Sequence, residues 1–274
     1  MNNTPHCLVL RLAAPLQSWG SASEFNRRDT DGIPTKSGIA GLLAAAQGRR
    51  RQDPIEDLLG MCLAVRTDQA GTLLRDYHTV STLDGSPLPK SERNKSGRQL
   101  PTSPKKFTHL TERFYLQDAC FVAVIGLDDL ELLKALAHAV THPGYPLALG
   151  RRSCPPTQPF LLPHGENNNT LWPGTPEEVV AHVPWQGKPQ RYQKITDTSI
   201  SLAVTVDAEG TSLDSPKDAT IDTRNDLPTS FDPRKRSFGT RRVVHYWVNA
   251  PVPEALIEEQ TRPEHDPFDL LEVG

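Results

Sequence analysis

The residues best suited to binding an anion lie in the segment Tyr145–Thr157, whose centre reads Gly150-Arg151-Arg152. The segment opens with apolar residues, which predicts a strand that leads into a turn at Gly150. Glycine lets a backbone approach closely, and each of two adjacent guanidiniums can bind phosphate oxygens in a bidentate manner. The pattern therefore predicts a phosphate-binding turn, with an ordinary solvated turn as the alternative.

A second candidate phosphate site is the start of a predicted helix at Pro34-Thr35-Lys36-Ser37-Gly38. Thr35 is a suitable N-cap, and apolar residues follow it at helical spacing. The unpaired amides of the first turn, the positive end of the helix dipole and Lys36 together favour a bound phosphate. Ordinary capping without a ligand is the alternative.

A long basic excursion, residues 81–113, separates two predicted strands at Leu73–Val80 and Phe114–Ile125. Residues 90–113 carry seven positive charges against two acids, a net charge of +5. So long a connection inside a compact domain is often functional, and its charge suits a nucleic-acid backbone. A disordered, solvated loop is the alternative. The positive side chains of this arm are Lys90, Arg93, Lys95, Arg98, Lys105, Lys106 and Arg113.

Composition narrows the class of protein. The chain has 274 residues, 36% hydrophobic content and 25 prolines, which favours one large domain, or one domain and a smaller one, with many loops. No run of about 18 apolar residues and no secretory leader occurs, so we expect a cytoplasmic protein that does not contact a membrane. The four cysteines are far apart and form no CxxC pair, which predicts buried free thiols and no zinc site.

The net charge of −3 is unevenly distributed along the chain. Residues 1–155 carry a net charge of +4 and residues 156–274 a net charge of −7. This asymmetry predicts an anion-binding face in the first part of the chain. The second part still holds a basic cluster within residues 233–242, and after residue 250 seven acids against Arg262 predict an acidic, flexible tail.

The predicted elements follow the order strand, helix, strand, long arm, strand, helix, strand. This order is typical of a ferredoxin-like, RRM-like βαββαβ domain whose second and third strands have an elongated connection. We therefore predict an α+β protein with the RNA-binding domain in residues 1–156, a smaller β-rich, loop-rich region in residues 157–250 and a tail in residues 251–274. The last strand of the domain is expected just before Gly150.

An enzymatic function is an alternative that the residues leave open. His78 beside Tyr77, or His109 near Lys105 and Lys106, could supply a base and a cation to a metal-independent ribonuclease. No spacing ties these groups together, so we favour a non-catalytic nucleic-acid binder. A scaffold that binds only protein would leave the basic arm and the paired arginines unexplained.

Five separated segments occur in an order typical of one known family. They are Leu8–Gly20, Pro34–Leu43, Leu74–Val80, Thr111–Ala119 and Leu149–Pro155. Together they resemble the Cas-five subunits of the type I-E CRISPR surveillance complex, Cascade. The likeness covers residues 7 to about 160 and resumes at about 233–248, and the basic connection at 81–110 is longer than is usual in that family.

The resemblance implies a ferredoxin-like domain with a long β-hairpin thumb at about 75–113. Such subunits cap the 5′ handle of the guide RNA within Cascade. They contact a Cas-seven backbone subunit and the large PAM-reading subunit, and they meet target DNA only through the complex, in antiviral defence. A separate endonuclease processes the guide in type I-E systems, which implies a non-catalytic subunit without cofactors, although type I-C relatives cleave CRISPR repeat RNA.

Carried over to matching positions, the resemblance implies that the Gly150–Arg152 turn and the helix start at Lys36 face the handle, and that Arg113 is the thumb arginine nearest the rejoining strand. Trp19 could form a lid on the core, which we favour, or stack on a base. We expect no catalytic residue and no metal ligand. The residues expected to bind RNA, besides the basic arm, are Gln17, Trp19, Arg27, Lys36, Ser37, Gly38, Arg75, Tyr77, His78, Arg113, Tyr145, Gly150, Arg151 and Arg152.

Overall fold

The computed structural model of the chain describes residues 5–20, 26–165, 167–188, 198–208, 218–254 and 256–257. A seven-stranded antiparallel sheet forms its centre, in the order β10-β1-β9-β4-β11-β13-β12. No helix in the described ranges is long and apolar enough to cross a membrane. The strands are β1 (His6–Ala13), β4 (Cys62–Gln69), β9 (Cys120–Gly126), β10 (Leu171–Pro173), β11 (Ser199–Asp207), β12 (Thr220–Ser230) and β13 (Ser237–Pro251).

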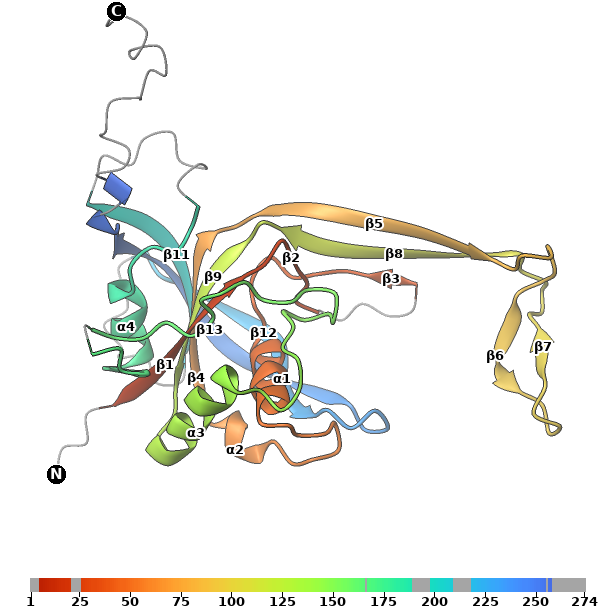
Figure 1. Cartoon of the computed structure of the whole chain (residues 1–274), viewed down its shortest axis with the longest axis horizontal. Helices are drawn as coiled ribbons and strands as arrows, with labels where there is room; N and C mark the ends of the chain where they lie inside the picture. Colours follow the sequence, from red (N-terminus) through yellow and green to blue (C-terminus); the bar gives the residue numbers. More distant parts are fainter. Residues whose placement is uncertain are drawn as a thin grey trace, which may run out of the picture.

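Both faces of the sheet are covered, which explains the nearly continuous apolar run of β1. Successive residues of β1, such as Val9 and Leu10, belong to the cores on opposite faces of the sheet. Helices α1 (Lys36–Ala46), α2 (Glu56–Leu59) and α3 (Leu130–Thr141) pack on one face. Helix α4 (Pro176–His182) covers the other (Figure 1). The predicted cap of α1 is confirmed, because the Thr35 side chain accepts a hydrogen bond from the Gly38 amide.

A long two-stranded ribbon projects from the sheet (Figure 1). It consists of β5 (Thr72–Ser81) and β8 (Thr108–Gln117), which pair antiparallel from Thr72↔Gln117 to Ser81↔Thr108. At its far end a small hairpin is formed by β6 (Pro89–Arg93) and β7 (Gln99–Pro101). At its near end, β2 (Leu16–Gln17) and β3 (Arg27–Arg28) pair with the other edge of β8.

The predicted α+β class is confirmed, but two of the predicted strands are wrong in detail. The segment before Gly150 is not a strand, because the Leu149 amide donates to the Cys154 carbonyl in a local turn and no ladder forms. The predicted strand Phe114–Ile125 is divided between β8 and β9 at Asp118, whose φ is +56°.

The strands of residues 157–250 do not form a sheet of their own. β10 pairs with β1, and β11 pairs with β4, so these strands extend the sheet that residues 1–156 begin. Helix α1 connects β1 to β4, α3 lies between β9 and β10, and β10-β1-β9-β4 is the order across the sheet. The ferredoxin-like assignment stays a prediction. Most of the predicted acidic tail, residues 258–274, lies outside the described residues.

Candidate nucleic-acid interface at the ribbon base

The register of β5 and β8 assigns each side chain to one of two faces. Directly paired residues of an antiparallel ribbon share a face, and successive residues alternate between faces. Arg75 pairs with Phe114, and Tyr77 with Glu112, on one face. Asp76 pairs with Arg113 on the other face. Strand β3 extends both faces, because Arg27 and Arg28 are the register partners of Glu112 and Arg113.

The first face, here called the basic–aromatic face, carries Arg27, Arg75, Tyr77, Glu112 and Phe114. The Arg27 guanidinium lies over the Phe114 ring at 5.1 Å, and the Arg75 guanidinium lies 5.7 Å from the Tyr77 ring centroid. Arg75 also approaches Glu112 at 3.7 Å, and the Tyr77 side chain is 49% exposed. Phe114 is half-buried, so the exposed Tyr77 ring and the exposed Arg27 guanidinium are the stacking surfaces that this face offers to unpaired bases.

The second face, here called the arginine face, holds Arg28 and Arg113 as neighbours on parallel strands. The carboxylate of Asp76, on the third strand, lies 3.3 Å from Nδ1 of His78. Arg113 is exposed and has no ion pair among the residues that the structure describes. Like charges on adjacent strands repel, so an anion bound over this face would be stabilised by both guanidiniums.

Arg151 joins the arginine face through hydrogen bonds to the backbone. Its Nη1 donates to the Phe114 carbonyl oxygen at 2.9 Å, and its Nη2 donates to the Arg28 carbonyl oxygen at 2.8 Å. Its guanidinium lies 4.6 Å from the centroid of the Tyr115 ring. Tyr115 shares the face of Arg113, two residues away, so Arg151 both adds charge to this face and holds β3 against β8.

Gly150 sets the position of this turn. Its φ is +90°, and a Cβ atom here would overlap the backbone carbonyl of Ser18. The Ser18 amide in turn donates to the Leu149 carbonyl oxygen at 3.1 Å. Glycine therefore lets the turn rest directly on the chain that follows β2. Arg152, two residues after Gly150, is exposed and has no partner in the described part of the chain.

The helix start does not offer a phosphate site, which corrects the prediction for Lys36. Lys36 is 6% exposed, and its Nζ donates to Oδ2 of Asp207 at 2.8 Å. The backbone amide of Lys36 donates to Oδ2 of Asp226 at 2.7 Å, so a carboxylate of the protein already occupies the positive end of the dipole. Arg241 pairs with both aspartates.

The neighbouring Ser37 and Gly38 are also used within the fold. The Ser37 hydroxyl lies 3.3 Å from that of Thr35. A Cβ atom on Gly38 would meet the Trp19 ring at 2.8 Å, so this glycine allows α1 to approach Trp19. Both residues therefore support the cap of α1 and its packing, and the structure gives neither a ligand-facing role.

Gln17 and Trp19 are buried, which corrects their assignment as RNA contacts. Both are 0% exposed. Nε2 of Gln17 donates to the carbonyl oxygens of Leu12 and Ala119, and Nε1 of Trp19 donates to Oε1 of Gln17 at 3.1 Å. The ring of Trp19 forms the lid on the core that we favour from the sequence, and a buried ring cannot stack on a base.

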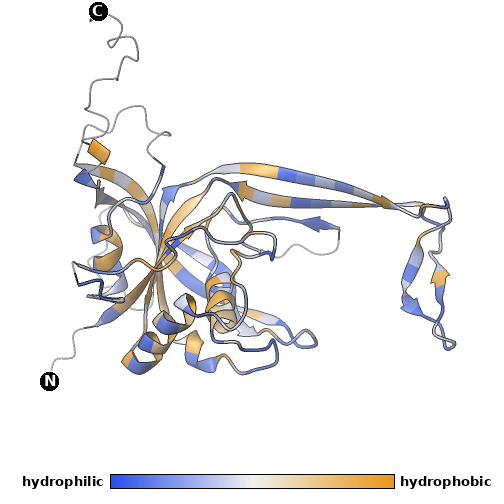
Figure 2. Cartoon of the chain, viewed as in Figure 1, coloured by the Kyte–Doolittle hydropathy of each residue, from blue (hydrophilic) through white to orange (hydrophobic). Residues whose placement is uncertain are grey.

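The remaining predicted residues lie away from the ribbon base. Tyr145 is 44% exposed, and its amide donates to the Ala45 carbonyl at the end of α1. The distal hairpin of the ribbon is largely hydrophilic in Figure 2. The basic side chains of the arm are all exposed, and they are Lys90, Arg93, Lys95, Arg98, Lys105 and Lys106.

The proposed catalytic pair His78 and Tyr77 is not assembled. The two are consecutive residues of β5, so their side chains leave opposite faces of the ribbon. His109 lies within β8, where it is the register partner of Val80. Within the described ranges, no group of three His, Cys, Asp or Glu side chains could hold a metal ion.

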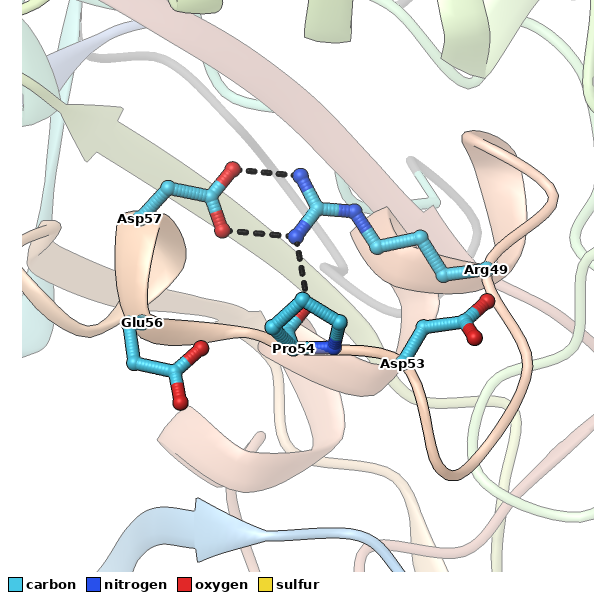
Figure 3. Close-up of a pocket in the computed structure, with 5 residues that line it drawn as sticks. All are labelled: Arg49, Asp53, Pro54, Glu56 and Asp57. Atoms are coloured by element: carbon cyan, nitrogen blue, oxygen red, sulfur yellow. Dashed lines mark hydrogen bonds and ion pairs between the residues drawn. The ribbon is translucent and has the colours of Figure 1, made fainter.

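A surface pocket outside the ribbon is lined by α2 and by the loop that follows α1 (Figure 3). Arg49 dominates it, but its guanidinium forms two hydrogen bonds with the Asp57 carboxylate and one with the Pro54 carbonyl. The hydrogen bond from Arg49 lowers the pKa of Asp57. Asp53 and Glu56 add negative charge, so this pocket does not suit a phosphate.

Sequence reasoning missed three members of the interface. Arg28, Phe114 and Tyr115 are not among the residues expected to bind RNA, although Arg28 follows Arg27 and both aromatics adjoin Arg113. The signal that could have found them is the two-residue period of β8, which places residues 113 and 115 on one face and residues 112 and 114 on the other.

Residues 7–244 match the family described as CRISPR-associated protein (Cas_Cas5). The CRISPR system Cascade subunit CasD of Escherichia coli (strain K12) is 36% identical over 170 residues, covering 57% of this chain and 69% of that protein. A chain of a CRISPR RNA-guided surveillance complex superposes with a TM-score of 0.67 at 29% identity, covering 97% of this chain and 98% of that one. The crystal structure of a Cas protein superposes with a TM-score of 0.56 at 27% identity, covering 92% of this chain and 97% of that one. The chain therefore belongs to the Cas5 family of CRISPR-associated proteins.

Proposed function

We propose that this chain is a subunit of a Cascade-type surveillance complex and that it binds the 5′ handle of the guide RNA at the ribbon base. The observation that carries the proposal is the grouping of Arg28, Arg113 and Arg151 on the arginine face. Three guanidiniums on one face, together with the exposed Arg152 that follows Arg151 in the sequence, can neutralise and position consecutive phosphates of a single strand. The similarity to a chain of a CRISPR RNA-guided surveillance complex supports RNA as the polyanion.

The basic–aromatic face supplies the second part of the proposed recognition. Single-stranded RNA is usually read through unstacked bases that lie on aromatic rings or guanidinium planes. Arg27 over Phe114 and Arg75 beside Tyr77 provide two such platforms. Removal of one stacking platform is expected to cost roughly 1–3 kcal/mol of binding free energy. A strand that wraps the edge of the ribbon would therefore place phosphates on one face and bases on the other.

The projecting ribbon suits contacts with other components of such a complex. Its distal end stands far from the sheet in Figure 1 and carries the basic side chains of the arm. In the proposed assembly the ribbon acts as the thumb, beside a Cas-seven backbone subunit and near a kink in the guide. The large PAM-reading subunit is the second proposed neighbour. Target DNA would be met only through the complex.

The proposed role is non-catalytic and needs no cofactor. The ribonuclease alternative rests on His78, whose Nδ1 lies 3.3 Å from Asp76, a contact that could orient the ring as a base. Tyr77, the other member of the predicted pair, points to the opposite face of the ribbon. The test is incubation of the purified chain with a labelled CRISPR repeat RNA, with and without divalent metal. An uncleaved RNA is expected, whereas cleavage that disappears in His78→Ala would establish the ribonuclease.

Assembly provides the test of the proposed function as a whole. The chain would be co-expressed with guide RNA and the other subunits of its complex, and the purified particle would be analysed for RNA and subunit content. Arg113→Ala combined with Arg152→Ala should reduce incorporation of the chain, because neither side chain has a structural partner among the described residues. Lys134→Ala, on α3, should incorporate normally. Normal incorporation of the double variant would place the RNA contact elsewhere.

A further inference from the structure

The hairpin between β12 and β13 carries a second basic surface that the ribbon-base site does not use. Residues 233–242 include Arg234, Lys235, Arg236, Arg241 and Arg242 and contain no acid. Arg241 forms ion pairs with Asp207 and Asp226, whereas the other four basic side chains are exposed. In a chain with a net charge of −3, so dense a positive tip is a local feature rather than a consequence of composition.

One acid, Asp232, adjoins the tip in the sequence, and among the described residues no ion pair joins it to a basic side chain. Oδ1 of Asp232 accepts a hydrogen bond from the Arg234 backbone amide, and the Lys235 amide donates to the Asp232 carbonyl oxygen. The Asp232 carboxylate therefore stabilises the turn. The side chains of Arg234 and Lys235 remain exposed at its end, which Figure 2 draws as hydrophilic.

An aromatic platform accompanies the charges. The Arg236 guanidinium lies 5.0 Å from the centroid of the Phe238 ring, and the Phe238 side chain is 37% exposed. A large apolar ring that remains exposed on a strand, with a guanidinium over it, has the composition of a base-stacking site. A phosphate-binding patch alone would not need the ring, and an acidic protein surface would not use it for stacking.

The hairpin is held firmly to the body of the molecule. Its base is fixed by the Arg241–Asp226 pair, whose second aspartate oxygen accepts from the Lys36 amide at the start of α1. Phe231, just after the end of β12, packs beside Gly41 of α1. The hairpin that presents the tip is therefore anchored at its base, and anchoring of this kind lowers the entropy cost of binding. In Figure 1 this hairpin and the ribbon extend from the sheet toward the same side.

We propose that the β12–β13 hairpin tip binds single-stranded nucleic acid, with Arg234 and Lys235 on phosphates and the Arg236–Phe238 stack under an unpaired base. This surface is separate from the ribbon base and adds to the proposed function a second contact with a strand. Single strands expose base faces to such a stack, while duplexes hide them. Residues of the distal arm are not needed for this contact.

The test is lysine footprinting of the full chain, which reports on each surface separately. The chain is acetylated with and without oligouridylate of about 15 nucleotides, and the modification of each lysine is measured by mass spectrometry. Acetylation of Lys235 should slow about threefold or more when the strand is bound. Lys134, an exposed lysine on α3, is the internal control and should not change. Lys90 and Lys95 report on the arm.

Two further measurements make the outcome decisive. Poly-L-glutamate of matched charge should protect Lys235 less than oligouridylate does, and Phe238→Leu should reduce the protection by oligouridylate while leaving every basic residue in place. If Lys90 and Lys95 were protected from acetylation and Lys235 were not, binding at the hairpin tip would be contradicted, but RNA binding by the chain would not. Equal protection by polyglutamate, or full protection in Phe238→Leu, would also overturn it. If no lysine were protected, both the inference and RNA binding by the isolated chain would be contradicted.

Discussion

Arg28 and Arg113 are direct neighbours on the parallel strands β3 and β8, and both side chains belong to the arginine face. The Asp76 carboxylate, the register partner of Arg113 on the same face, offsets only part of the repulsion between these two guanidiniums. Arg151 does not relieve this charge, because it adds a third guanidinium while it bonds to the Arg28 backbone. The arrangement is stabilised if an anionic strand lies across the ribbon base.

Arg151 and Arg152 are adjacent arginines with different expected roles. Arg151→Ala removes two charge-assisted hydrogen bonds to carbonyl oxygens, so it should lower the free energy of unfolding by about 1–3 kcal/mol and loosen β3. Hydrogen exchange of the β3 amides and of the Glu112 amide, which donates to the Asn26 carbonyl, should accelerate. Arg152→Ala is the matched control and should leave exchange unchanged. Equal exchange in both variants would show that Arg151 does not hold the strand.

The turn at Gly150 should tolerate no side chain. Gly150→Ala is expected to lower the free energy of unfolding by about 2 kcal/mol or more, because a left-handed φ and an overlap with the Ser18 carbonyl act together. Gly165→Ala is the matched control, since Gly165 has a φ of +65° but nothing within 4 Å of a Cβ atom. That control should cost about 1 kcal/mol. Urea denaturation compares the two, and similar losses of stability would contradict the close contact.

Acid should weaken the buried ion network behind α1. Burial raises the pKa of Asp226, but the hydrogen bond and charge of Arg241 outweigh it, and the pKa lies below the usual 3.8. A lowered pKa gives stability that is present above the unfolded-state value and is lost as the pH falls through the folded-state value. The free energy of unfolding should therefore fall as the pH drops below about 5.

Asp226→Asn tests the source of that acid dependence. The variant should be less stable at pH 7, because the Arg241 guanidinium loses one of its two carboxylates in a buried site. It should also show a shallower decline in acid, since one titrating group has been removed. Urea denaturation at a series of pH values measures both effects, and an unchanged acid slope would mean that other carboxylates dominate.

Local patterns in the sequence predict part of this architecture well. Near-neighbour chemistry is sufficient to predict the apolar run of β1, the Thr35 cap and the long excursion between β5 and β8. The two-residue period of β5 is likewise sufficient to separate Tyr77 from His78. These features depend only on residues close together in the chain.

Other assignments depend on partners that are distant in sequence. Lys36 has the composition of a phosphate ligand, but its carboxylate partners, Asp207 and Asp226, lie 171 and 190 positions away. Trp19 and Gln17 are polar or amphipathic residues in a loop-like segment, and their burial follows from the approach of α1 and of Ala119. No local pattern reports such contacts, so the sequence alone assigns Lys36 and Gln17 to the RNA and leaves both a core lid and a base-stacking role open for Trp19.

The most direct test of the central claim is a binding measurement with guide RNA that contains its 5′ handle and with the same RNA lacking it, over a series of salt concentrations. The chain should prefer the handle-containing RNA. Arg113→Ala with Arg152→Ala should weaken that binding and reduce the slope of log K against log salt by about 0.7 for each phosphate that the variant no longer neutralises, while Lys134→Ala changes neither. Equal affinity for both RNAs, or a double variant that binds like the unmodified chain, would contradict RNA binding at the ribbon base.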